Sequence, residues 1–310
     1  MHKFSTRRDF LRASTVTALG LSAGAFAARA IEPIPRQGAP RLMLSLAAYS
    51  FRNFFRYTND KKPSTEFRSI ELSDFVNFCG EHNCAAEVTS YYFPKQITDE
   101  FLLNLKRHAF LRGVPISGSA VGNTFALKPG PERDKQIADT KKWIDHAALL
   151  SAPHIRIFAG NATKDATKEE AKKLCIEAIE ECCDYAGKRG VVLGLENHGG
   201  IVAEPADLLE IVRAVKSPWF GINLDTGNFH TDDPYADLAA CAPYAVNVQV
   251  KGVIRRRGQK TDEPSDLKRV AKLLRDANYQ GYVALEYEMA EDPWKAVPRL
   301  LEELRTAITG

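Results

Sequence analysis

The feature that most constrains the fold is an eightfold alternation of short β-rich runs with longer stretches of helical periodicity, starting at Arg41. Successive strand starts are roughly 25 to 45 residues apart, the length of one βα unit. Eight such units predict an α/β fold with a closed parallel barrel. No G-x-G-x-x-G and no phosphate loop follows the first run, which disfavours an open, doubly wound nucleotide-binding sheet.

The predicted elements fill the chain from residue 41 onward without a low-complexity linker. The predicted strands cover residues 42–48, 85–89, 116–121, 154–159, 191–196, 220–225, 245–250 and 282–286. The predicted helices cover residues 72–82, 99–111, 134–150, 168–188, 205–215, 235–241, 265–277 and 294–306. The sequence therefore predicts a single (β/α)8 barrel domain over residues 41–310.

The first thirty residues predict an export signal. Arg7 and Arg8 precede Phe10 and Leu11, and the uncharged residues 13–28 end in small side chains. This pattern resembles a twin-arginine signal, which implies the twin-arginine export machinery as partner and a periplasmic destination. The uncharged stretch is too weakly apolar for a stable membrane anchor. We expect residues 1–30 to be the signal and 31–40 a Pro-rich lead-in; an ordinary basic amphipathic start is the alternative.

Charge argues against nucleic acid as a partner. The formal net charge is +3, but the first thirty residues hold five basic side chains and one acid. The rest of the chain has 37 basic and 38 acidic side chains, so it offers no broad basic surface for phosphates. The oligomeric state is left open, a homo-oligomer included.

The six cysteines form no C-x-x-C pair, which disfavours a structural zinc site. An exported protein can form disulfides, and a bridge between Cys79 and Cys84 is compatible with their spacing. We expect buried thiols instead.

Polar side chains stand where four predicted strands end. Glu196, Asp225 and Glu286 each follow an apolar run, and Gln249 and Lys251 lie on one side of the seventh strand. Acids buried together repel each other unless a cation compensates them. An all-oxygen set of Glu196, Asp225, Gln249 and Glu286 favours one Mg²⁺ or Mn²⁺, with Co²⁺ as a further candidate.

These motifs resemble the sugar phosphate isomerase and epimerase family with the xylose-isomerase-like barrel. Glu196, Asp225 and Glu286 match the positions at which that family holds its metal. Where the family has His-Val-Lys-Asp, this chain has Gln249 followed by Val, Lys and Gly. The resemblance also implies that Arg255, six residues beyond Gln249, contacts substrate.

Further residues fit a pocket for a small sugar or polyol by their position near strand ends. These candidate substrate-binding residues are His198, Asn228, Arg156, Glu87 and Tyr49, beside Arg255. Inter-strand ion pairs or core packing are the alternative for Arg156, Glu87 and Tyr49.

The resemblance implies metal-dependent isomerisation or epimerisation of a small sugar or keto-sugar. Glu196 and Glu286 would exchange a proton with substrate through an enediolate, and Lys251 would stabilise its charge. Loss of the same proton followed by expulsion of a β-hydroxyl gives a lyase or dehydratase instead. A non-catalytic carbohydrate-binding barrel is the other alternative, since Gln249 replaces the family's His.

Overall fold

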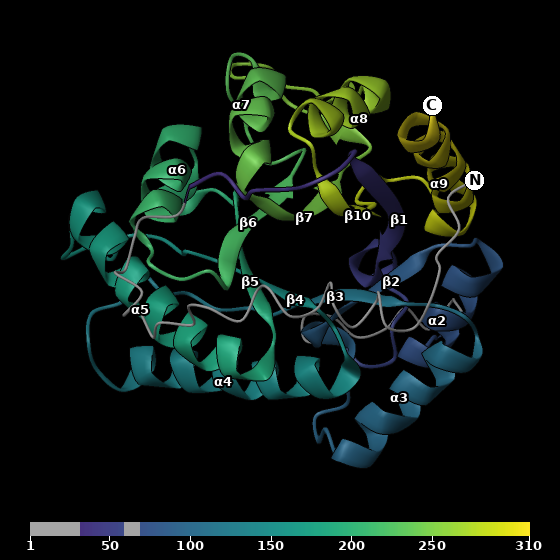
Figure 1. Ribbon diagram of the computed structural model, residues 1–310, viewed down its shortest axis with the longest axis horizontal. Coiled ribbons are helices and arrows are strands. Elements are labelled where there is room, and N and C mark those ends of the chain that lie inside the picture. Colours follow the sequence, from purple (N-terminus) through teal and green to yellow (C-terminus); the bar gives the residue numbers. More distant parts are fainter. Residues whose placement is uncertain (1–31, 59–68) are drawn as a thin grey trace, which may run out of the picture.

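Eight parallel strands close into a barrel (Figure 1). The computed structural model describes residues 32–58 and 69–310, and within them the strands are hydrogen-bonded in the closed order β1-β10-β7-β6-β5-β4-β3-β2. The strands are β1 (Arg41–Ala47), β2 (Ala85–Thr89), β3 (Ile116–Ala120), β4 (His154–Ile157), β5 (Val192–Glu196), β6 (Phe220–Asp225), β7 (Ala245–Val250) and β10 (Gln280–Leu285). The predicted (β/α)8 barrel is confirmed.

The helices surround the barrel on its outside (Figure 1). They are α2 (Leu72–Glu81), α3 (Asp99–Leu111), α4 (Pro131–Leu150), α5 (Lys168–Arg189), α6 (Pro205–Ala214), α7 (Pro234–Cys241), α8 (Leu267–Asp276) and α9 (Pro293–Thr309). Short 3-10 turns occupy η1 (Ala48–Phe51), η2 (Ser90–Tyr92), η3 (Gly200–Val202) and η4 (Ala242–Tyr244). None of the helices in the described ranges is both long and apolar enough to cross a membrane.

Local chemistry explains where the helices begin and end. The Thr167 side chain accepts a hydrogen bond from the backbone N–H of Glu170, and the Glu170 carboxylate accepts one from the backbone N–H of Thr167, so a capping box starts α5. The same helix ends at Gly190, whose φ of 70° suits glycine. The helix predicted at 134–150 begins three residues earlier, at Pro131, because proline is accommodated in the first helical turn.

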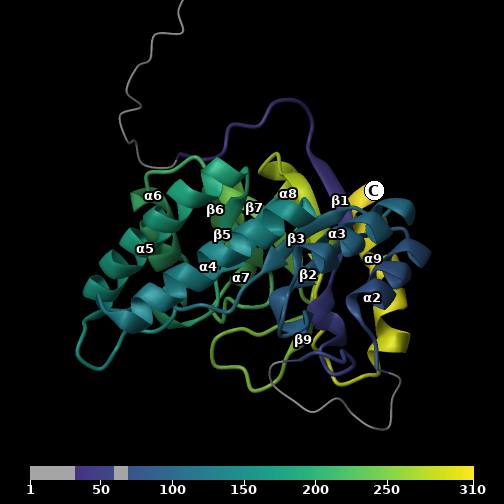
Figure 2. The same ribbon diagram turned by 90° about the horizontal axis from the view of Figure 1, so that it is seen from below.

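Two features frame the two ends of the barrel. The Pro-rich lead-in, from residue 32 onward, crosses the amino-terminal ends of the strands, where the backbone N–H of Ile34 donates to Pro243; Figure 2 shows it as the purple segment that leads into β1. At the other end, the loop after β7 forms the hairpin of β8 (Val253–Ile254) and β9 (Glu263–Pro264), which the sequence did not predict. The predicted export signal, with Arg7 and Arg8, lies outside the described residues.

The core lies between the sheet and the helices and inside the barrel. Strands β2, β3, β4 and β6 are buried at every residue, as expected when helices cover the outside of a parallel sheet. All six cysteines lie in the described ranges, buried and with free thiols, as expected.

The interior near the amino-terminal ends of the strands depends on one glycine. The imidazole of the buried His154 packs over β3, and a Cβ at Gly118 would lie 1.9 Å from His154 Cε1. Only a residue without a side chain leaves room for the ring at this point.

We expect Gly118→Ala to lower the free energy of unfolding by about 1–3 kcal/mol, the usual cost of overpacking a tight core. Urea denaturation of Gly118→Ala, alone and in a His154→Ala background, measures the effect. The loss should shrink by more than half when the ring is absent; an equal loss in both backgrounds would contradict the explanation.

Candidate functional site

The candidate site lies where β5, β6, β7 and β10 end side by side at the carboxyl-terminal mouth of the barrel. Glu196 and Asp225 are the last residues of β5 and β6, and Glu286 follows β10 directly. Asp225 is paired in register with Gln249 of β7. Parallel strands in this register place the four predicted oxygen donors at one end of the barrel, which is where barrels of this architecture hold their sites.

A closed ring of hydrogen bonds forms beneath the mouth. It links four buried side chains, which we call the amide floor: Glu87, Asn223, Asn247 and Gln249. Gln249 Nε2 donates to Glu87 Oε1 at 2.6 Å, and Gln249 Oε1 accepts from Asn223 Nδ2 at 2.7 Å. Asn247 Nδ2 donates to Glu87 Oε2 and to Asn223 Oδ1, each at 2.8 Å. Both ends of the Gln249 amide are therefore used.

The carboxyl group of Glu87 has no ion-pair partner in the described part of the chain. The pKa of Glu87 is raised to about 7: burial is the main cause and the nearby Glu286 adds to it, while the hydrogen bonds from Gln249 and Asn247 oppose the shift. Glu87 belongs to the floor, since its oxygens are engaged by the two amides.

Above the floor, Arg156 of β4 holds Glu196. Arg156 Nε lies 2.8 Å from Glu196 Oε2, and both side chains are at most 5% exposed. Asn228 Nδ2 donates to the other oxygen, Glu196 Oε1, at 2.9 Å. The sequence predicted Arg156 and Asn228 as substrate ligands; in this structure both fix the Glu196 carboxyl group, as the inter-strand ion-pair alternative for Arg156 proposed.

On the opposite side of the mouth, Lys251 gathers three acids around its ammonium group. Lys251 Nζ lies 2.6 Å from Glu286 Oε2, 2.7 Å from Glu288 Oε2 and 3.4 Å from Asp225 Oδ2. The ring of Tyr49 lies beside it, with its centroid 6.0 Å from Nζ. Lys251 is thus a buried counter-ion for acids of β6 and β10 together.

The two candidate acid–base residues, Glu196 and Glu286, have pKa values shifted in opposite directions. Burial raises the pKa of Glu196 to about 7, and Arg156 only partly offsets it. Burial acts in the same direction on Glu286, but Lys251 and Arg156 together hold the pKa of Glu286 below its ordinary value. For Asp225, burial outweighs Lys251 and raises the pKa. A pair of acids with pKa values pushed apart suits general acid–base chemistry.

A cavity of about 630 Å³ opens over this cluster. Its lining includes Lys251, Asn228, Arg255 and Met289. Arg255 is bound to Asp262 at 2.7 Å at the base of the β8–β9 hairpin. The volume is ample for a small-molecule ligand.

His198 lies at the edge of the cluster. Its ring packs on Phe158, with 4.6 Å between the centroids, and Phe158 in turn carries the guanidinium of Arg156 3.9 Å above its ring. Burial lowers the pKa of His198, and the nearby Arg156 lowers it further. The structure therefore brings a neutral imidazole to the Arg156 side of the mouth.

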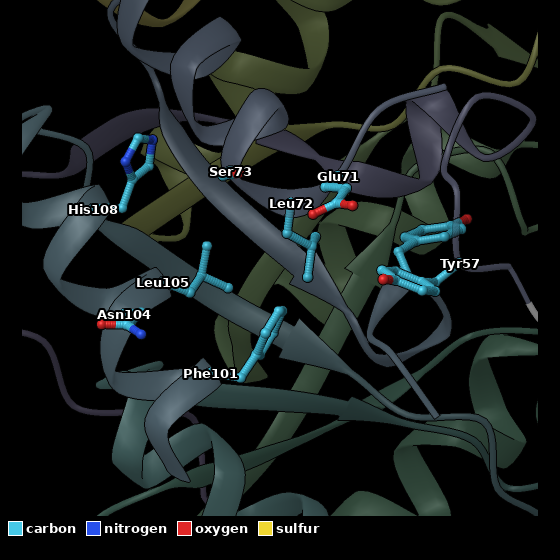
Figure 3. A pocket seen from close by; sticks show the side chains of 9 residues that line it. Tyr57, Glu71, Leu72, Ser73, Phe101, Asn104, Leu105 and His108 are labelled. Carbon is cyan, nitrogen blue, oxygen red and sulfur yellow. The ribbon is translucent and has the colours of Figure 1, made fainter. Parts of the chain in front are cut away.

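A second cavity, of about 290 Å³, lies outside the barrel between α2 and α3. Figure 3 shows Phe101 and Leu105 on one side of it and Leu72 on the other. Two of its polar groups have structural partners, since Glu71 Oε1 accepts a hydrogen bond from Arg56 at 3.0 Å and His108 is hydrogen-bonded to Asn77 at 2.9 Å. It holds none of the predicted site residues.

The donor chemistry of the site fits a divalent cation. Among the described residues, the site gathers five carboxyl groups, those of Glu87, Glu196, Asp225, Glu286 and Glu288. Arg156 and Lys251 form ion pairs with the last four, and Asp225 Oδ2 is buried without a hydrogen-bond partner. Excess buried negative charge and an unpaired carboxylate oxygen both favour a cation. As arranged, however, no three His, Cys, Asp or Glu side chains in residues 32–58 and 69–310 form a group that could hold a metal.

Sequence reasoning missed two members of the amide floor. Asn223 lies two residues before Asp225, and Asn247 two before Gln249, so strand periodicity places each pair on one side of its strand. This two-residue spacing was the sequence signal from which Asn223 and Asn247 could have been identified. Glu288, a partner of Lys251, was not among the predicted site residues either.

The fold and the cluster define a (β/α)8 barrel with its polar site at the carboxyl ends of the strands. The family model for the xylose isomerase-like TIM barrel matches residues 68–304, so the chain belongs to that family. A Xenopus laevis protein named "Putative hydroxypyruvate isomerase" is 23% identical over 229 residues, 69% of this chain and 82% of that protein.

Solved structures agree in fold. The 3-keto-D-glucoside 4-epimerase YcjR of E. coli superposes with a TM-score of 0.63 at 18% identity, over 86% of this chain and 99% of that one. The protein IolI, whose crystal structure holds a zinc atom, gives a TM-score of 0.66 at 18% identity, over 86% and 96%. At these identities the likeness establishes the barrel.

The raised pKa of Glu87 predicts a pH dependence of stability. The folded state, with a pKa of about 7 for Glu87, binds more protons between pH 4.5 and 7 than an unfolded chain does. Stability therefore falls as pH rises through this window. In Glu87→Gln this contribution is absent, so between pH 4.5 and 8 the wild type should lose on the order of 3 kcal/mol more than the variant.

Urea denaturation at several pH values measures the difference. Glu100→Gln, at an exposed position on α3, controls for loss of an acid at the surface. Parallel pH profiles for the wild type and Glu87→Gln would contradict the prediction.

Proposed function

We propose that this protein is an isomerase or epimerase that moves a proton on a small sugar or keto-sugar through an enediolate. The observation that carries the proposal is the pair Glu196 and Glu286, which are held at one barrel mouth by different cations and have oppositely shifted pKa values. Such a proton transfer requires an ionised base and a protonatable acid near one cavity. The cavity is lined by Lys251 and Asn228, the hydrogen-bond partners of Glu286 and Glu196.

Glu286 is the proposed base. Its carboxylate takes the proton from the carbon next to the substrate carbonyl, and the electron pair of that C–H bond forms the C=C of the enediolate. Lys251, 2.6 Å from Glu286, keeps the carboxylate ionised while no cation is bound there, and from the cavity wall it can offer its ammonium charge to the enediolate oxygen.

Glu196 is the proposed acid. In an epimerase it gives its proton to the other face of the same carbon. In an isomerase it gives its proton to the former carbonyl carbon, while the hydroxyl proton on the neighbouring carbon passes to the enediolate oxygen and leaves a carbonyl there. Arg156 and Asn228 fix both oxygens of Glu196 and so orient the carboxyl group relative to the cavity.

The finer proposal includes one divalent cation, Mn²⁺ or Mg²⁺ with Co²⁺ as a further candidate, held by Glu196, Asp225, Gln249 and Glu286. When bound, such a cation supplies Lewis-acid polarisation of the substrate carbonyl. Gln249 enters this set only through Oε1, which has a second lone pair beyond the bond to Asn223.

The charge of the site favours an uncharged substrate. With five carboxyl groups and two basic side chains among its described residues, the site lacks the excess positive charge that binds a phosphate, whereas hydroxyl groups of a sugar can donate to carboxylates and accept from Lys251. We therefore propose a free sugar, a keto-sugar or a keto-glycoside.

Elimination remains the second candidate, because abstraction by Glu286 can be followed by loss of a β-hydroxyl as water. A binding barrel without turnover is the third, and the full engagement of the Gln249 amide in the floor is the observation in its favour.

Glu286→Gln should lower the rate of solvent deuterium exchange into a ketose or keto-glycoside by about 100-fold or more, since a carboxamide is no base. Mass spectrometry of a ketose panel incubated in D₂O measures exchange, and product analysis separates isomerase from lyase. Glu303→Gln, at an exposed position on α9, is the control and should exchange at the wild-type rate. Exchange by Glu286→Gln at the wild-type rate would refute the assignment; no exchange by the wild type with any sugar would favour the binding barrel.

The same proposal includes export, with Arg7 and Arg8 in a twin-arginine signal. We expect the double substitution Arg7→Lys, Arg8→Lys to leave the precursor in the cytoplasm, because that pathway reads the arginine pair. Immunoblots of periplasmic and cytoplasmic fractions measure this. Arg41→Lys is the matched control, and normal export of the double variant would disprove the twin-arginine assignment.

A further inference from the structure

We propose that the ammonium group of Lys251 and a divalent cation are alternative occupants of one acidic position at the barrel mouth, so that a metal binds only when Lys251 leaves. The inference rests on the metal site of the proposed function. It concerns a different property, namely how this chain controls the affinity of that site through its own side chain.

The position of Lys251 carries the first step. Its Nζ contacts Glu286 at 2.6 Å and Asp225 at 3.4 Å, two of the four predicted metal ligands. The side chain is 9% exposed, so the ammonium lies among the acids and not above them in solvent. A metal bound to both carboxylates would have to occupy the space between them where the ammonium lies.

The second argument is the electrostatic repulsion between the Lys251 ammonium group and a divalent cation. Asp225 Oδ2 is buried, accepts no hydrogen bond and has Lys251 as its ion-pair partner. An ammonium group and a divalent cation a few ångströms apart repel strongly in a buried site. One of them must therefore leave the carboxylates of Asp225 and Glu286 when the other binds.

The structure also shows a second position that the Lys251 ammonium group could occupy, next to Glu288. The backbone N–H of Lys251 is fixed to Thr226 Oγ1 at 3.0 Å, so the movement is confined to the side chain. Glu288, whose side chain is 40% exposed, already holds Nζ at 2.7 Å from the solvent side. Lys251 and Glu288 both line the 630 Å³ cavity. Rotation toward Glu288 would carry the ammonium out of the cluster without leaving it unpaired.

Gly227 makes room for the lysine stem. A Cβ at this position would lie 2.6 Å from Lys251 Cγ, so the aliphatic part of the side chain packs directly on the glycine backbone. Because the stem passes so close to the loop after β6, its terminal nitrogen reaches Asp225 at the end of the same strand.

The test is metal affinity without substrate. Mn²⁺ is titrated by calorimetry into chelator-treated wild type, Lys251→Met and Lys135→Met, an exposed lysine of α4 that serves as control. Lys251→Met should bind Mn²⁺ at least tenfold more tightly than the wild type, and Mn²⁺ should raise its melting temperature more. Lys135→Met should match the wild type. Equal affinity of Lys251→Met and wild type, or no binding by either, would overturn the proposal.

A crystal structure of the wild type soaked in Mn²⁺ keeps the proposal testable if Lys251→Met does not fold. Anomalous density about 2.1 Å from Asp225 and Glu286, with Nζ moved toward Glu288, would support it. Density at both carboxylates with Nζ still in place would overturn it. The proposed reaction is tested separately, by deuterium exchange. If no exchange occurs, the reaction proposal fails, whatever the result of the Mn²⁺ titration.

Discussion

The balance of charge at the barrel mouth is the constraint on which the site depends. A parallel barrel buries the ends of its strands, and here acids of β2, β5 and β6 and the acid that follows β10 are buried together. Among the described residues, Arg156 and Lys251 are the basic side chains that form ion pairs with them. Burying acids without compensation is costly, so each must find a donor, a cation or a proton. Glu196 has Arg156, Glu286 has Lys251, and Glu87 has two amides. This distribution separates the acids into different protonation states and so gives the mouth its chemical asymmetry.

The amide floor explains how Gln249 fits this balance. A glutamine has a donor at one end and an acceptor at the other, and Gln249 uses them to join the carboxyl group of Glu87 to the amide of Asn223. Gln249, which stands where the family resemblance led us to expect a His, therefore belongs to a hydrogen-bond network that joins three strands, β2, β6 and β7. A fully satisfied buried network of this kind holds its members rigidly, because any rotation leaves a polar atom unpaired.

The sequence predicted the barrel and the strand-end acids because both follow from local patterns. The eight strands are found where their apolar runs predicted them, and Glu196 and Asp225 end their strands as expected. What the sequence could not predict depends on closure of the barrel. The bond between Glu87 and Gln249 joins residues 162 positions apart, and nothing near either residue specifies the other. The β8–β9 hairpin was missed because two-residue strands carry no usable period.

The strand order of the closed barrel also determines which basic side chain forms an ion pair with which acid. Lys251 and Glu286 follow β7 and β10, which are neighbours in the barrel although β8, β9 and α8 separate them in the chain. Arg156 and Glu196 likewise extend from the adjacent strands β4 and β5. Each cation is thus supplied by a strand next to that of its acid, and the two pairs lie on different sides of the mouth. A substrate in the cavity would meet Asn228, which binds Glu196, and Lys251, which binds Glu286. Of the two cations, Arg156 and Lys251, only the ammonium is on a flexible stem at the cavity wall, so the Lys251 side is the one that can change its occupant.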